Sequence, residues 1–233
     1  MLRLRAAVTV AAVLMTTPVH AADLHVIAAG AVRGILGGMI EEYSRQTGVK
    51  VTFTAGPTGL LRDTINAGKP ADLVITSAPL MAELETSGKI VTGSRTDLGR
   101  VGMGVVVRAG TPEPDISTPA AVKNALVKAQ SIAFTDPKLG GTSVLYLLDL
   151  AEQFGIKDAV AAKGVTATGG NDAAAKVADG KADIAIVPIT DIHAKNAKLV
   201  GPVPEPIQLW TVYAAAIPKS STDPGAARAF LPP

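Results

Sequence analysis

Four short segments of small residues, each placed where a strand pattern gives way to a helical one, offer the clearest chemistry in this sequence. They are Gly30-Ala31, Thr58-Gly59, Gly141-Thr142-Ser143 and Gly170-Asn171. The first backbone N–H groups of a helix lack intrahelical partners, and the helix dipole adds partial positive charge there. Small side chains let an anion approach these groups. Any one turn is equally well an ordinary N-cap, but four at the carboxyl ends of parallel strands predict an anion-binding cleft.

The other side chains offer little for catalysis or metal binding. Beyond residue 21 the histidines are His25 and His193, which are far apart and in no metal-ligand spacing. The chain has no cysteine, and no nucleophile elbow, Walker loop or dinucleotide fingerprint occurs. Asp63 and Asp72 are acids that could pair in space, although a solvated or capping role is commoner. We therefore expect no catalytic residue, no metal and no cofactor, and a protein that is not an enzyme.

The amino terminus has the pattern of an export signal. Arg3 and Arg5 precede an apolar run over residues 6–15, a break at Pro18 and a small residue at Ala21. The run is about half of the ~20 residues that a membrane span needs, which disfavours the alternative of a buried or membrane helix. Residues 1–21 are therefore predicted to be a secretory signal peptide cut after Ala21. Since no cysteine is available for a lipid anchor, we expect the product in the periplasm.

Charge and aromatic content exclude one class of partner. The chain has 22 Lys plus Arg and 20 Asp plus Glu; residues 1–21 contain two arginines and no acid, so 20 of each sign remain. Eight aromatic residues and no basic run provide neither the electrostatics nor the stacking surfaces for nucleic acid. No later segment is long and apolar enough to span a bilayer, so we expect no membrane insertion. We expect a monomer.

Strand and helix patterns alternate along the rest of the chain. Strand patterns occupy residues 24–30, 49–56 and 71–78, and helical spacing follows each at residues 35–47, 58–67 and 79–87. After residues 99–110, a second series has strands at 131–136, 165–168 and 183–189 and helices at 119–129, 142–154 and 171–179. Residues 209–218 form the last strong strand pattern. Short strand–helix units of this kind indicate parallel sheets flanked by helices.

Two apolar strands with flanking glycines bracket the second series, at residues 102–109 and 211–218. If both cross between lobes, the fold is two Rossmann-like α/β lobes joined by a two-strand hinge. Lobe I then comprises residues 22–104 with 213–233, and lobe II residues 105–212. One continuous doubly wound sheet is the alternative that the pattern leaves open.

Several of these segments resemble one family. VIAAGAVRGIL, TGLLRDTINAGKPADLVITSA, VVVRAG, IAFTDPKLGGTSVLYLLDL and GKADIAIVP are similar to the corresponding elements of molybdate-binding-like periplasmic solute-binding proteins, the type II receptors of ABC importers. The resemblance spans most of residues 23–218. It implies the type II two-lobed fold, capture of a small anion between the lobes, and delivery to an ABC permease in the inner membrane.

The resemblance also implies which positions hold the ligand. In that family, backbone N–H groups and hydroxyls hold a tetrahedral oxyanion. The matching positions are Gly30, Thr58, the Gly141-Thr142-Ser143 turn, the Gly170-Asn171 turn and Pro188. Gly30 and Pro188 stand where the family has a serine and a tyrosine, and Thr58 replaces a serine. Each missing donor to a buried oxyanion costs on the order of 1–3 kcal/mol.

Two ligand classes therefore stay open. The first expectation, which the name-giving members of the family favour, is a molybdate- or tungstate-like oxyanion, and the alternative is a small di- or tricarboxylate in a roomier pocket. Arg33, just after the first turn, is the cation that we expect to serve a carboxylate, because arginine forks match carboxylates. Arg62 and Lys138 are more typical of a solvated surface. A non-transport sensor or scavenger of the same fold is a further alternative.

Overall fold

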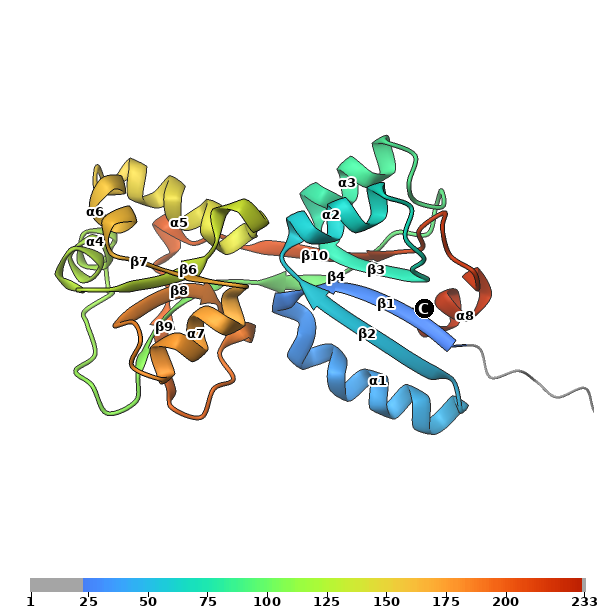
Figure 1. The fold of residues 1–233 in the computed structure, drawn as a ribbon, viewed down its shortest axis with the longest axis horizontal. Coiled ribbons are helices and arrows are strands. Elements are labelled where there is room, and N and C mark those ends of the chain that lie inside the picture. The colour runs from blue at the N-terminus through green and yellow to red at the C-terminus, as the bar shows by residue number, and fades with distance from the viewer. Residues whose placement is uncertain (1–22, 232–233) are drawn as a thin grey trace, which may run out of the picture.

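The computed structural model describes residues 23–231 and contains two five-stranded sheets, each flanked by helices (Figure 1). The predicted fold class of two α/β lobes is confirmed, and one continuous sheet is excluded. The predicted signal peptide, residues 1–21, lies outside the described residues. We call the part around the sheet β2-β1-β3-β10-β4 lobe I, and the part around β7-β6-β8-β5-β9 lobe II.

The lobe I sheet has a parallel half and an antiparallel half. In sheet order its strands are β2 (Lys50–Gly56), β1 (Asp23–Ala29), β3 (Leu73–Ser77), β10 (Thr211–Ala216) and β4 (Thr96–Val101). β1 pairs in parallel with β2 and β3, whereas β10 runs antiparallel to β3 and β4. The parallel strands β1, β2 and β3 therefore end at one edge, at Ala29, Gly56 and Ser77.

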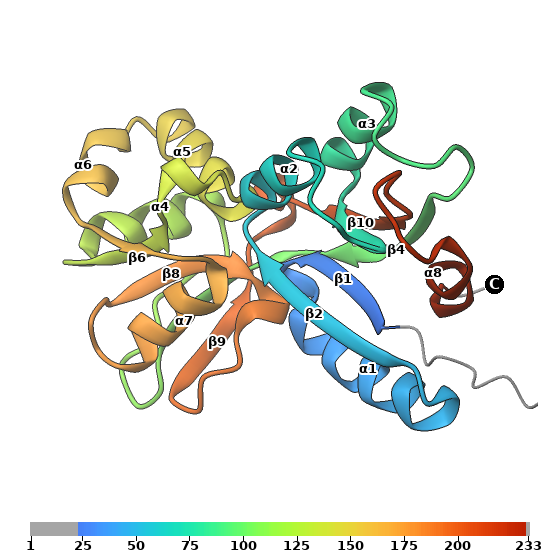
Figure 2. The ribbon, with the colours of Figure 1, turned by 45° about the vertical axis from the view of Figure 1, so that its right-hand side comes forward.

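Helices cover both faces of this sheet. α1 (Arg33–Thr47) lies on one face, and α2 (Thr58–Asn66) and α3 (Ala78–Thr86) lie on the other (Figures 1 and 2). Leu36 of α1, Ile65 of α2 and Met81 of α3 are buried against the strands. Each helix thus buries an apolar stripe on a strand of a βα unit, as the sequence pattern predicts.

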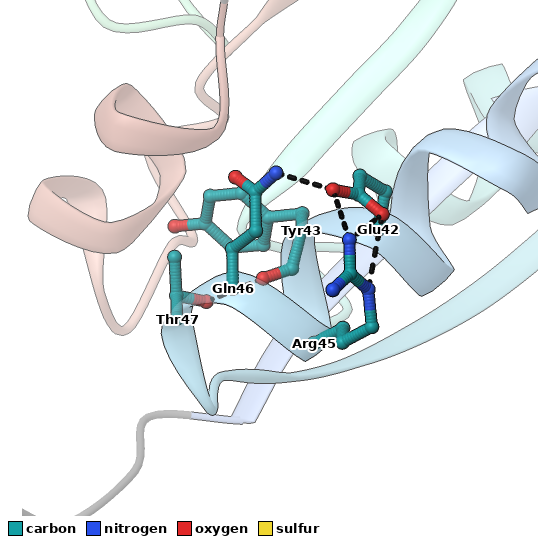
Figure 3. Close-up of polar contacts among 5 residues, drawn as sticks. All are labelled: Glu42, Tyr43, Arg45, Gln46 and Thr47. Carbon is teal, nitrogen blue, oxygen red and sulfur yellow. Dashed lines mark hydrogen bonds and ion pairs between the residues drawn. The ribbon is translucent and has the colours of Figure 1, made fainter.

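Polar contacts hold the last turns of α1. The guanidinium of Arg45 donates to the Glu42 carboxylate at 2.6 Å, and Glu42 also accepts from the Gln46 amide (Figure 3). The Thr47 hydroxyl donates to the backbone oxygen of Tyr43 at 2.8 Å. These contacts on the solvent side leave the ring of Tyr43 for packing with another element.

That element is the last helix, α8 (Pro224–Phe230). The rings of Tyr43 and Phe230 meet edge to face with their centroids 4.9 Å apart. Ala227 is fully buried, and Phe230 and Leu231 pack against the lobe I core. The carboxyl-terminal helix is therefore an integral part of lobe I.

Lobe II repeats the plan of lobe I. In sheet order its strands are β7 (Gly164–Ala167), β6 (Ile132–Thr135), β8 (Ile184–Pro188), β5 (Met103–Arg108) and β9 (Ala197–Pro202). β6 is parallel to β7 and β8, and β5 is antiparallel to β8 and β9. One face carries α4 (Pro119–Lys128), α5 (Thr142–Gln153) and α6 (Lys157–Ala162), and the other carries α7 (Gly170–Ala178).

The chain crosses between the lobes twice (Figure 1). β4 ends in lobe I and β5 begins in lobe II, so the first crossing is at Gly102; the second lies between β9 and β10. The predicted division at residues 104 and 213 needs a small correction at both places. Gly104 pairs with Val187 and Pro202 in the lobe II sheet, and Val212 pairs with Arg100 in the lobe I sheet.

Candidate functional site

A cavity of about 300 Å³ lies between the lobes, where the carboxyl ends of the parallel strands of both sheets face each other. From lobe I it is lined by Ala29, Gly30, Ala31, Arg33, Ala55, Gly56, Pro57, Thr58, Leu60 and Tyr213. From lobe II it is lined by Thr135, Gly141, Thr142, Ser143, Thr168, Gly169, Gly170, Asn171, Asp172, Pro188 and Asp191. We call this cavity the cleft.

Nine of the ten residues expected to bind a ligand line the cleft: Gly30, Ala31, Arg33, Thr58, Gly141, Thr142, Ser143, Gly170 and Asn171. The tenth, Gly59, faces a neighbouring hollow instead. All four turns thus meet at one place, two from each lobe. Their contact with a ligand remains a prediction.

Thr58 and Gly59 bind the opposite lobe. The Thr58 hydroxyl donates to the backbone oxygen of Gly140 at 2.9 Å, and the Gly59 N–H donates to the same oxygen at 2.7 Å. A side chain on Gly59 would meet the backbone oxygen of Leu139 at 2.5 Å, so only glycine allows this approach. Gly140 itself has φ of +61°, a conformation that favours glycine. We call these two hydrogen bonds the clasp.

Three helices begin at the cleft without a side-chain cap. The N-cap residues are Pro57 for α2, Gly141 for α5 and Gly169 for α7, and none supplies a capping hydrogen bond. By contrast, the Thr118 hydroxyl caps α4 by accepting from the Ala121 N–H at 3.1 Å. Uncapped helix starts that face a cavity leave backbone N–H groups and partial positive charge for an anion.

Asp191, which the sequence analysis missed, is buried in the wall of the cleft. It ends the short helix η3 (Ile189–Asp191) and is 3% exposed. Its Oδ1 is buried and has no hydrogen-bond partner among residues 23–231. Burial raises the pKa of Asp191 to about 7, although the positive charge of Arg33 acts in the opposite direction. A carboxyl that titrates near neutrality in a cavity is typical of functional sites.

The packing around Asp191 depends on glycine. A side chain at Gly170 would collide with Asp191 Oδ2, and one at Gly30 would come within 4.0 Å of Oδ1. The Asn171 amide donates to the backbone oxygen of Asp191 at 3.2 Å and so fixes η3 against α7. Gly170, in one of the predicted turns, therefore provides the space for this carboxyl group, whereas a side chain on Gly30 would make only an ordinary van der Waals contact with it.

Arg33 and Tyr213 complete the polar part of the wall. Arg33 is exposed, and its Nη2 donates to the backbone oxygen of Ala55 at 3.0 Å. Tyr213 is 3% exposed and comes from β10. Burial, and secondarily the charge of Asp191, raise the pKa of the Tyr213 phenol, which therefore keeps its proton. At Pro188, where the resemblance implies a tyrosine, the wall has no hydroxyl, but another tyrosine, Tyr213, lines the cleft.

The other charged residues considered from the sequence lie elsewhere. Lys138 is exposed and outside the cleft lining, and Arg62 lines the neighbouring hollow and pairs with Asp63 at 3.5 Å. Asp72 is buried in lobe I, where it accepts a hydrogen bond from the His25 N–H at 2.9 Å. Asp63 and Asp72 therefore form no pair.

Within residues 23–231, no helix has both the length and the apolar character that crossing a membrane requires. In the same part of the chain, no three His, Asp or Glu side chains gather as a metal site would need.

Residues 24–232 match the family described as bacterial extracellular solute-binding protein. The chain belongs to this family. The fold and the inter-lobe cleft agree with that membership, and the predicted resemblance to molybdate-binding-like type II receptors is confirmed. The periplasmic molybdate-binding protein of Azotobacter vinelandii has the same fold, with a TM-score of 0.73 and 23% identity, over 89% of this chain and 90% of that one.

Two further proteins are similar to this chain. The AgtB protein of A. tumefaciens R10, solved in complex with agropinic acid, has a TM-score of 0.68 and 19% identity, over 90% of this chain and 76% of that one. At such identity the likeness concerns the fold alone. A curated relative named aconitate isomerase, from a Pseudomonas species, is 32% identical over 95% of this chain and 87% of its own length.

Proposed function

We propose that this solute-binding protein captures a small di- or tricarboxylate in the cleft and delivers it to an ABC permease. The signal peptide predicted at residues 1–21 would send it to the periplasm, where it would act as a monomer. Family membership supports the binding role. The ligand class rests on the chemistry of the cleft.

The proposed ligand class rests mainly on the position of Asp191 inside a cleft suited to anions. Its Oδ1 has no hydrogen-bond partner among residues 23–231 and is therefore available to a hydrogen-bonding group of a ligand. A volume of about 300 Å³ is at the lower end of pockets for organic ligands. Arg33 offers a cation to one carboxylate, and the uncapped starts of α5 and α7 offer N–H groups to another. The relative named for aconitate, a tricarboxylate, also supports this class.

The test is a thermal-shift panel with two groups of anions. One group contains cis-aconitate, trans-aconitate, citrate and succinate, and the other contains molybdate, tungstate, sulfate and phosphate. A ligand at 100 times its Kd stabilises the native state by about 2.7 kcal/mol, which raises the melting temperature by several degrees. We expect shifts in the first group. Shifts confined to molybdate and tungstate would establish the oxyanion alternative, and no shift with any anion would contradict the anion-binding function.

Catalysis is a second candidate function, favoured by one specific observation. The relative is named an isomerase, and a carboxyl with a pKa of about 7 is suited to transfer protons at neutral pH. Incubation with cis-aconitate followed by proton NMR tests this function. Appearance of trans-aconitate at a rate proportional to protein concentration would establish it, and unchanged cis-aconitate alongside a thermal shift would leave binding alone.

A further inference from the structure

We infer, on the basis of the proposed ligand site, that Asp191 carries a proton when the cleft holds a carboxylate ligand and donates it to that ligand in a hydrogen bond. The proton comes from solvent. Above neutral pH, binding of a fully ionised carboxylate would then take up one proton for each ligand bound. This property would select ligands that accept a hydrogen bond at the position of Asp191.

The surroundings of Asp191 offer its carboxyl group few other hydrogen-bond partners. Its Oδ1 is buried without a partner among the described residues, and an ionised carboxylate in that state is strongly disfavoured. A protonated carboxyl group has one O–H to donate and needs one acceptor. A ligand carboxylate is such an acceptor, and two adjacent carboxylates cannot both stay ionised, so they share a proton.

The charged groups around Asp191 favour the same arrangement. Arg33 of α1 is the cation that acts on Asp191. If Asp191 were ionised, it would offset the charge of Arg33 and weaken the attraction for an anion. On α7, Asp172 pairs with Lys176 at 3.7 Å and accepts from the Thr168 N–H at 2.8 Å, so this pair brings no net charge.

Two further titratable groups lie near Asp191. Tyr213 of β10 keeps its proton, since burial and the charge of Asp191 raise the pKa of its phenol. His193, two residues along the chain, is exposed, and its ring packs where a side chain on Gly34 would otherwise lie. His193 is therefore the neighbouring ionisable side chain that the experiment has to separate from Asp191.

Isothermal titration calorimetry with trans-aconitate at about pH 8 measures the proton directly. Titrations in two buffers of different ionisation enthalpy give the number of protons taken up, which we expect to approach one. Between about pH 7 and pH 9, the affinity should fall by about tenfold per pH unit, since each unit makes protonation of the empty site tenfold rarer.

Two variants assign the proton to its residue. Asp191→Asn keeps the shape and a hydrogen donor without a titrating group, so it should bind trans-aconitate with no proton uptake and a flat pH profile. His193→Gln should keep both the uptake and the tenfold slope. Circular dichroism checks that each variant is folded. If Asp191→Asn is unfolded, the number of protons taken up by the unmodified chain and by His193→Gln decides whether the proton belongs to His193 or to Asp191.

The outcomes separate this inference from the proposed function. Binding of trans-aconitate without proton uptake, or uptake that persists in Asp191→Asn, overturns the inference and leaves the carboxylate receptor standing. Uptake that disappears in His193→Gln assigns the proton to His193 and also overturns it. Absence of any binding by trans-aconitate, cis-aconitate, citrate or succinate contradicts the proposed function and the inference together.

Discussion

At the scale of single residues, two buried aspartates of the same chain show opposite behaviour. Asp72 and Asp191 are both 3% exposed. Burial by itself would raise the pKa of Asp72, but hydrogen bonds from the backbone of His25, Asp223 and Thr222 and from the Ser221 hydroxyl outweigh it and lower that pKa. Asp191 Oδ1 has no such partner. Asp72 therefore stabilises the folded state as an anion. Ionised Asp191 instead destabilises the folded state, and a ligand that supplies a hydrogen-bonding partner can relieve this effect.

Asp191→Asn should stabilise the empty protein at alkaline pH. The pKa of Asp191 is about 7 in the folded state against an ordinary 3.8, so the folded state binds the extra proton and stability falls as pH rises through that window. Each pKa unit corresponds to about 1.4 kcal/mol. The variant should therefore raise the free energy of unfolding by on the order of 4 kcal/mol at about pH 8 and leave it nearly unchanged at about pH 4. Urea unfolding at both values measures it.

Asp72→Asn is the matched control with the opposite sign. The lowered pKa of Asp72 contributes stability that is present above its unfolded pKa and is lost as pH falls through the folded value. This variant should lose about 1–3 kcal/mol at about pH 8, and less in acid. A loss of stability in both variants at about pH 8 would show that Asp191 is satisfied in solution.

At the scale of elements, the clasp depends on the start of α2 meeting the loop that contains Gly140. α2 lies in lobe I, while Gly140 lies between η2 (Pro137–Leu139) and α5 in lobe II. Two donors, the Thr58 hydroxyl and the Gly59 N–H, share one carbonyl oxygen. Because this oxygen lies beside the cleft, the same contact closes one side of the cavity and joins the lobes.

Gly59→Ala should weaken ligand binding by opening the clasp. The new methyl group would lie 2.5 Å from the backbone oxygen of Leu139 and 3.2 Å from Gly140, so the two lobes would have to separate locally. Loss of two neutral hydrogen bonds, each worth about 0.5–1.5 kcal/mol, corresponds to roughly 10-fold or more in Kd for whichever anion shifts the melting temperature. Calorimetric titration of that anion measures the loss.

Gly38→Ala is the control for Gly59→Ala. Gly38 lies within α1, and a side chain there would meet no atom within 4 Å. Alanine in a helix is favoured over glycine by about 1 kcal/mol, so this variant should be slightly more stable and bind the anion unchanged. If Gly59→Ala binds as tightly as Gly38→Ala does, the clasp has no part in binding.

At the scale of the whole molecule, the sequence predicts what depends on periodic apolar patterns. The βα units and their turns follow from strand and helix periods, and so does the meeting of the turns at one edge. The edge strands β4 and β9 contain no buried residue and carry no apolar alternation, so only their pairing with β10 and β5 defines them. Asp191 has no motif; its burial follows from packing of η3 against η1 (Gly30–Val32) and α7. Its position three residues beyond β8 was the available signal.

The arrangement of the lobes makes a prediction about the molecule in solution. Two crossings at Gly102 and between β9 and β10 connect the lobes, and the clasp is formed in this structure. A ligand that contacts both lobes favours the joined arrangement by its differential affinity. We therefore expect the empty protein to sample longer inter-lobe distances and a carboxylate ligand to remove them.

The absence of cysteine from the sequence allows this closure to be measured with introduced labels. Thr86→Cys on α3 and Asn124→Cys on α4 place spin labels at exposed positions of lobe I and lobe II. Trans-aconitate should narrow the distribution of distances between these two labels and shift it towards short distances. The control pair, Asn124→Cys with Ala159→Cys, lies within lobe II, so its distance distribution should not change. An unchanged inter-lobe distribution at saturating ligand would mean that the lobes are already fixed, and that the clasp is part of a rigid fold.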